Sequence, residues 1–113
     1  MARMSVAEFF SQVKQVCDRT DFVVRIVVWA KSQRQLKLRI ILNDRSVIAA
    51  YYNCENGKMA YAQLKNNQRI FGADNANDVW HWHLRENPSQ HIEAEREITF
   101  EEFLEEIEKA IQP

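Results

Sequence analysis

The chain has 113 residues, 46% of them hydrophobic, and this length predicts one domain over residues 1–113, because most domains contain about 100–150 residues. Its 15 Lys and Arg nearly balance its 16 Asp and Glu, which excludes a uniformly basic nucleic-acid-binding protein, so any RNA contact needs a local basic patch. No apolar run approaches the roughly 20 residues that span a bilayer and the N-terminus lacks a signal-peptide pattern, so we expect a cytoplasmic protein with no membrane partner.

The first predicted element is an amphipathic helix that begins after Ser5. Ser5 and Glu8 match a capping box, in which each side chain accepts a hydrogen bond from the other residue's backbone amide. Apolar residues then recur at three-four spacing from Val6 to Cys17. One face of this helix should therefore pack on a core.

Between residues 22 and 97 the apolar period changes to two, which indicates the strands of a sheet. Asn56-Gly57 is the strongest hairpin signal, because both residues tolerate the positive φ of a type I′ turn. Residues 72–78 indicate a polar loop. The short connections favour an antiparallel meander. Its six or seven strands are expected over residues 22–31, 36–42, 47–54, 59–64, 69–71, 79–84 and 91–97.

A second amphipathic helix follows the strands. Thr99 and Glu102 match its capping box, and an apolar stripe runs from Phe100 to Ile111. The opposite face is rich in glutamate, which predicts either a solvated surface or a surface for a basic partner. The predicted fold class is therefore α+β, with an antiparallel six- or seven-stranded meander sheet packed against N- and C-terminal amphipathic helices.

The penultimate strand carries the residues that are best suited to chemistry. In residues 80–83, Trp-His-Trp-His, alternation places both indoles on the core face and His81 and His83 on the other face, about 7 Å apart. If the turn that follows closes a hairpin, His83 lies opposite His91 and three imidazoles converge. Such a cluster fits a zinc or other divalent metal site on His81, His83 and His91, acid–base cleavage of a phosphodiester, or histidines that do no chemistry.

Polar residues beside this strand can complete a site. Asp74 and Asn75 precede it, and although an Asx turn explains both residues, they can also orient an imidazole or a ligand. In the phosphodiester hypothesis, Arg69 or Arg85 would stabilise the developing negative charge. His91 is then a further candidate for contact with a substrate.

Aromatic and basic residues of the middle strands suggest a nucleic-acid surface. Tyr51 and Tyr61 interleave with lysines, as in a platform for stacking single-stranded bases, although cross-strand packing explains the same pattern. The second strand and its turns are basic, which fits contact with a phosphate backbone or protection of an edge strand. The basic residues are Lys31, Arg34, Lys37, Arg39 and Arg45.

A set of short motifs lies between residues 51 and 91. They are Tyr51-Tyr52-Asn53, Gly57, Tyr61-Ala62, Arg69-Ile70-Phe71-Gly72-Ala73-Asp74-Asn75, Trp80-His81-Trp82-His83, Asn87-Pro88 and His91. Together with the closing helix they resemble the TumE-like family of small prokaryotic proteins, which are proposed toxins of toxin–antitoxin modules. The resemblance covers Val23 to Ile111, with Leu84 in place of a frequent proline and Ala73 in place of an aromatic or basic residue.

The resemblance implies an antitoxin partner and an RNA or translation-related target. It carries a catalytic role onto His81, His83, Asp74 and Asn75, with Arg69 and His91 behind them.

The sequence leaves three functional hypotheses open. The first is a toxin-like protein, without a required cofactor, that acts on RNA through the His, Asp and Asn residues. The second is a noncatalytic module that binds a protein partner or forms a homodimer through the acidic helix and a sheet edge. The third is a small metalloprotein.

Overall fold

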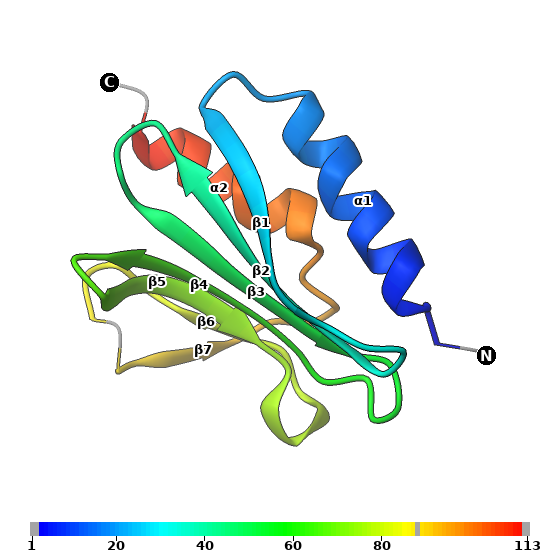
Figure 1. The fold of residues 1–113 in the computed structure, drawn as a ribbon. Coiled ribbons are helices and arrows are strands. Elements are labelled where there is room, and N and C mark those ends of the chain that lie inside the picture. The colour runs from blue at the N-terminus through cyan, green and yellow to red at the C-terminus, as the bar shows by residue number, and fades with distance from the viewer. Residues whose placement is uncertain (1–2, 88, 112–113) are drawn as a thin grey trace.

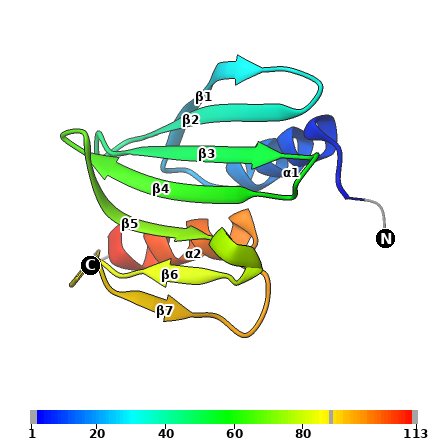
Figure 2. The same cartoon turned by 90° about the horizontal axis from the view of Figure 1, so that it is seen from below.

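Seven antiparallel strands lie side by side in chain order, from β1 to β7, and the helices α1 and α2 cover one face of this open sheet (Figure 2). The computed structural model describes residues 3–87 and 89–111, and Figure 1 shows how the two ends of the chain supply the two helices. The predicted α+β meander is confirmed, with seven strands. The elements are α1 (Val6–Asp18), β1 (Val23–Lys31), β2 (Gln35–Leu42), β3 (Val47–Asn53), β4 (Met59–Lys65), β5 (Gln68–Asp74), a 3₁₀ turn η1 (Ala76–Asp78), β6 (His81–His83), β7 (His91–Glu93) and α2 (Phe100–Ile111).

Both helices begin at the predicted capping boxes. The Glu8 amide donates to the Ser5 hydroxyl and the Ser5 amide donates to the Glu8 carboxylate, each at 3.0 Å. The Glu102 amide likewise donates to the Thr99 hydroxyl at 3.1 Å. These bonds satisfy amides that have no partner inside the helix. Within the described ranges, neither helix is long and apolar enough to cross a membrane.

The core lies between the helices and one face of the sheet, because alternate residues of β2, β3 and β4 are buried there. α1 lies against β1, β2 and β3. On α2, Phe103 is fully buried, with its ring centroid 5.2 Å from that of Tyr61, 5.1 Å from Phe71 and 6.4 Å from Trp82. The indole of β6 therefore faces the core, as predicted, and the opposite side of the strand faces away from the helices. We call the helix-free side the open face.

Two local predictions need correction. Asn66 and Asn67, at the tight turn between β4 and β5, both have positive φ, whereas at Asn56-Gly57 only Gly57 does. The β3–β4 connection is thus a longer loop than a type I′ turn, closed by the Gly57 amide donating to the Asn53 carbonyl at 2.9 Å. In addition, β5 continues to Asp74, so residues 72–74 pair with strands on both sides instead of forming a loop.

Candidate functional site

The candidate site lies on the open face, where β5, β6 and β7 run side by side (Figure 2). Register pairs Asp74 with His81, and it pairs His83 with Gly72 on one side and His91 on the other. The predicted pairing of His83 with His91 is confirmed. Because directly paired residues point to the same face of a sheet, the three imidazoles and the Asp74 carboxylate gather in one place.

His83 forms the buried base of this cluster. Its side chain is only 4% exposed, and its Nε2 atom lies 2.7 Å from Oδ2 of Asp74. The other carboxylate oxygen, Oδ1, accepts a hydrogen bond from the Ala76 amide at 3.1 Å. Asp74 therefore forms the expected Asx turn and also orients an imidazole.

The Asp74 carboxylate is held in its ionised form. Burial raises its pKa, but the Ala76 amide, the hydrogen bond from His83 and the charges of His83 and His81 together outweigh burial, so the pKa lies below its ordinary value. An ionised Asp74 only accepts hydrogen bonds, so the proton in its bond with His83 belongs to Nε2. When the ring carries only this proton, Nδ1 is an acceptor.

We expect Asp74→Asn to weaken the acid sensitivity of folding. A carboxyl whose pKa is lowered by folding stabilises the folded state above its ordinary pKa of 3.8, and this contribution disappears as the pH falls through the lower folded value. Urea midpoints measured below pH 4 should therefore fall less steeply for Asp74→Asn than for the parent chain. Asp21→Asn, at an exposed position outside the site, should keep the parent slope. Parallel curves for all three proteins would contradict this assignment.

The two other imidazoles lie above His83 and are accessible. The ring centroid of His91 is 4.4 Å from that of His83 and 5.8 Å from that of His81, and both ring pairs meet edge to face. His91 is exposed and His81 is half-buried. A substrate arriving at the open face therefore meets His91 and His81 first, whereas His83 supports them from below.

One buried nitrogen of the cluster has no partner among the residues that the structure describes. Nδ1 of His83 is buried and forms no hydrogen bond with the described part of the chain. An unpaired buried polar atom costs about 1–3 kcal/mol. Buried polar atoms in folded proteins nearly always have a partner, so this nitrogen is a site for an ordered water molecule or a ligand atom.

The geometry gives the metal hypothesis no support. Within residues 3–87 and 89–111, no group of three His, Cys, Asp or Glu side chains is arranged to hold a metal ion. The predicted set of His81, His83 and His91 therefore does not have this arrangement. His83 also uses Nε2 to bind Asp74.

Asn75, predicted to be catalytic, braces the loop beside the site. Its side-chain oxygen accepts from the Met59 amide at 2.9 Å, and its side-chain nitrogen donates to the Gly57 carbonyl at 2.8 Å. Both polar ends of the amide thus bind the backbone of the β3–β4 connection. Asn75 therefore holds the β3–β4 connection against the strand end that carries Asp74.

Arg69 lies close to the cluster, and Gly72 makes room for it. A Cβ atom added at Gly72 would lie 3.3 Å from Cδ of Arg69, 3.8 Å from Cβ of His83 and 3.0 Å from the backbone oxygen of Tyr61. The absence of a side chain at Gly72 thus lets the Arg69 stem lie across β5 next to His83. This placement fits the predicted role of Arg69 as a substrate-binding residue.

The two predicted substrate-binding tyrosines lie on opposite faces. Tyr51 faces the open side and lines a hollow of about 590 Å³ that Asp74, Asn75 and Lys58 also line. Tyr61 is only 2% exposed and packs against Phe103 in the core. Burial therefore removes Tyr61 from the candidate site, because a substrate on the open face cannot reach it.

Arg85 also lies away from the imidazoles. It donates at 2.7 Å to Gln63, a buried residue on the helix-covered face, and its guanidinium lies 4.8 Å from the ring centre of Phe71. Gln63 in turn donates to the Ser46 hydroxyl at 3.0 Å. Burial lowers the pKa of Arg85. This polar network is structural, and sequence alone could not show it because its members come from different strands.

At the other end of the open face lie Arg39 and Arg45, which the sequence predicted as part of a basic surface, together with an exposed tryptophan that it did not predict. Trp29, which is 65% exposed, stacks under the Arg39 guanidinium at 4.0 Å from the ring centre. A bulge between Val28 and Ala30 interrupts the β1–β2 register at this tryptophan. β2 is an interior strand, so edge protection does not explain why it is basic.

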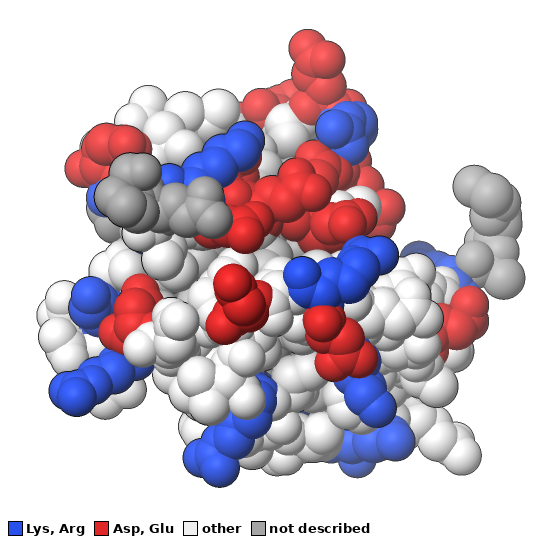
Figure 3. Space-filling model, turned by 90° about the horizontal axis from the view of Figure 1, so that it is seen from above, with Lys and Arg blue, Asp and Glu red and all other residues white. Residues whose placement is uncertain are grey.

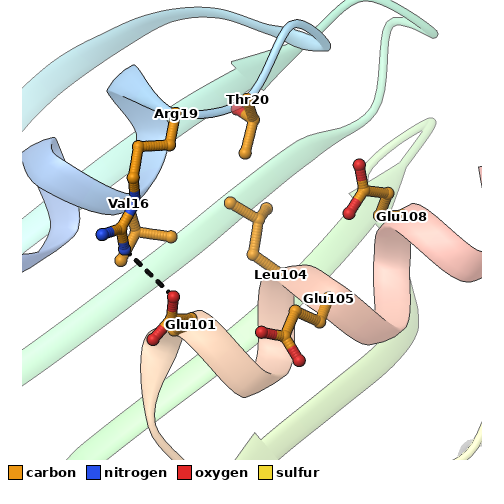
Figure 4. Close-up of a pocket in the computed structure, with 7 residues that line it drawn as sticks. All are labelled: Val16, Arg19, Thr20, Glu101, Leu104, Glu105 and Glu108. Carbon is orange, nitrogen blue, oxygen red and sulfur yellow. Dashed lines mark hydrogen bonds and ion pairs between the residues drawn. The ribbon is translucent and has the colours of Figure 1, made fainter.

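The helix-covered side has the opposite charge. Figure 3 shows acidic side chains gathered on this side of the molecule. A hollow of about 150 Å³ between the helices is lined by Glu101, Glu105 and Glu108 of α2 and by Arg19, which binds Glu101 at 3.0 Å (Figure 4). The acidic α2 surface is therefore remote from the imidazoles.

The chain was compared with known protein families, curated proteins and solved structures. None of them matches it.

Proposed function

We propose that the protein cleaves RNA by acid–base catalysis, with His81 and His91 as the catalytic residues and His83 and Asp74 as the residues that position them. The observation that carries this proposal is the layered cluster itself. A buried imidazole, fixed by a carboxylate at 2.7 Å, lies against an exposed imidazole at 4.4 Å between ring centres. Imidazole is the side chain best suited to move protons near neutral pH.

The chemistry needs two imidazoles with complementary roles. One accepts the proton of the ribose 2′-hydroxyl while that oxygen attacks phosphorus, and the other, protonated, gives a proton to the departing 5′-oxygen. The phosphorus–O5′ bond breaks, and the products are a 2′,3′-cyclic phosphate and a 5′-hydroxyl. Arg69, which lies beside His83, supplies positive charge for the phosphate oxygens. No redox partner or cofactor is needed.

We further propose that this activity is that of a toxin of a toxin–antitoxin module, as the resemblance to the TumE-like family implies. RNA is a cytoplasmic target, in line with the expected location. The acidic surface of α2 is distant from the imidazoles, so an antitoxin of basic character can bind there without filling the site. The rival proposal, a noncatalytic binding module or homodimer, rests on the same acidic surface.

The direct test is incubation of the purified chain with a labelled single-stranded RNA in the presence of a chelator. We expect cleavage with a 2′,3′-cyclic phosphate on the new end, identified by mass spectrometry, and none of a 2′-O-methyl copy of the same RNA. Absence of cleavage across neutral pH would overturn the proposal. Activity that the chelator abolishes would favour the metalloprotein instead.

Growth assays separate the toxin from the binding module. Expression of the parent chain should slow growth, and expression of the folded His81→Ala, His91→Ala double variant should not. Equal growth inhibition by both chains would favour the binding module.

A further inference from the structure

We propose that a single RNA strand lies across the open face, from Trp29 on β1 to the imidazoles on β6 and β7, along a path of small side chains. This inference rests on the proposed function and deepens it by defining the substrate as an extended single strand. We call the path the small-residue lane, defined by Ala49, Ala62 and Gly72.

One register row connects the two ends of the lane. Arg39 on β2 pairs with Ala49, Ala49 pairs with Ala62, and Ala62 pairs with Gly72. Gly72 in turn pairs with His83, and His83 with His91. Directly paired residues share a face, so a row of minimal side chains leads from a guanidinium to Gly72, where the Arg69 stem lies over the backbone beside His83.

Larger side chains border the lane on both sides. The neighbouring row pairs Ile41 with Val47, Val47 with Leu64, and Leu64 with Arg69. In the row on the other side, Lys37 pairs with Tyr51, which pairs with Ala60, and Ala60 pairs with Asp74. Except at Ala60, the lane is therefore lower than its borders, and it ends where Arg69 and Asp74 lie beside the imidazoles.

The far end of the lane offers stacking and positive charge. Trp29, Arg25, Arg39 and Arg45 line a hollow of about 710 Å³. The ion pairs within the described residues leave these three arginines unused. An exposed indole beside unpaired guanidiniums suits a base and its phosphates, because bases stack on aromatic rings and phosphates bind arginine.

The span of the lane requires an extended ligand. Four strand intervals separate β2 from β6, and at about 4.8 Å each they make about 19 Å. A mononucleotide cannot bridge that distance, whereas several nucleotides of a single strand can. A stiff duplex would not enter a path bordered on both sides.

Charge and the unpaired imidazole nitrogen favour RNA over a protein partner. The acidic side chains gather on the helix-covered side (Figure 3), whereas Arg25, Arg39 and Arg45 surround the hollow at the far end of the lane, so a polyanion is drawn toward that hollow. At the end of the lane, His83 is only 3% exposed, and its Nδ1 atom lacks a partner in the described part of the chain. A ligand at this end of the lane can give that nitrogen a hydrogen-bond donor, such as the amino group of a base.

The test measures binding with an RNA that cannot be cleaved. The probe is fluorescein-labelled 2′-O-methyl RNA of about 12 nucleotides, a length within the usual range for single-strand sites. Trp29→Leu should weaken the Kd about tenfold, because it removes one stacked base. Arg39→Gln should reduce the salt dependence of log Kd by about 0.7, the effect of one lost phosphate contact.

Matched controls lie on the helix side. Arg19→Gln removes the same charge as Arg39→Gln from an exposed position of the acidic hollow and should leave the salt dependence unchanged. Ala62→Leu should block the lane and weaken binding, whereas Ala7→Leu, at an exposed position of α1, should not. Circular dichroism checks that each variant is folded, and Trp29→Leu, at an exposed side chain, tests the lane even if Ala62→Leu fails to fold.

The outcomes separate this inference from the proposed function. Equal effects of Arg39→Gln and Arg19→Gln, together with unchanged binding by Trp29→Leu, would overturn the lane even if RNA is cleaved. Equal affinity for a duplex of the same length would also overturn it. Binding that depends on Trp29 and Arg39 without any cleavage of unmodified RNA would support the lane and remove the proposed function.

Discussion

The His81→Ala, His91→Ala double variant should cleave RNA more slowly than the parent chain by a factor of about 10²–10⁴ or more. This factor is the usual contribution of one general acid or base. Both side chains reach the surface of the open face, where the His91 ring meets His81 and His83 edge to face. Their removal should therefore spare the core. The measurement is kcat/KM on a short RNA, with unfolding in urea as the check on stability.

The matched control is Glu93→Gln, which changes an exposed neighbour on β7 that pairs with His81. This variant should keep most of the activity, because the carboxylate has no role in the proposed proton transfers. The rate of the parent chain should also pass through a maximum as the pH is varied, since one imidazole must be neutral while the other is protonated. Double-variant activity equal to that of the parent would remove the imidazoles from the mechanism.

Phe103→Ala should lower the free energy of unfolding by about 3–5 kcal/mol, the usual cost of removing a buried phenyl ring. Phe103 is fully buried on α2, and its ring stacks on Phe71 of β5 and on Trp82 of β6. The cavity would lie under the two strands whose other side carries the site. Urea unfolding at neutral pH measures the loss.

Phe10→Ala provides the comparison. Phe10 lies on α1, is only half-buried and has Lys14 over its ring at 5.6 Å. The same change in volume should cost less there, because water can reach the vacated space. Equal losses for both variants would show that α2 is not the main cover of the site-bearing strands.

The local features of the fold were predictable from the sequence because their signals are local. Two capping boxes mark both helix starts, and the apolar period of two marks the strands. Side-chain parity in residues 80–83 correctly placed the indoles toward the core and paired His83 with His91. Parity also explains why Tyr61 is buried, since Met59, Tyr61 and Gln63 are alternate residues of β4 and all point into the core. The same alternation can be read from the sequence.

The arrangement of the site depended on contacts between strands, which sequence spacing does not define. His83 is buried because Asp74 and Gly72 of the adjacent strand meet it, and nothing in the local sequence separates it from the more exposed His81. The exposure of Trp29 coincides with a bulge in β1, which interrupts the expected alternation. The two hydrogen bonds of the Asn75 amide to the backbone of another connection also depend on long-range contacts that the local sequence does not show.

The strict chain order of the seven strands also bears on how the protein forms. Each strand pairs with the strand that precedes it in the chain, so the hairpins can form one after another. Each step closes only a short loop, which favours rapid folding. α2 follows the whole sheet in the chain. The aromatic rings that it covers on β4, β5 and β6 therefore remain exposed to solvent until α2 is synthesised and docks. A nascent chain would thus carry the paired imidazoles on an incompletely covered sheet. Docking of the final helix would then stabilise the strands that hold them.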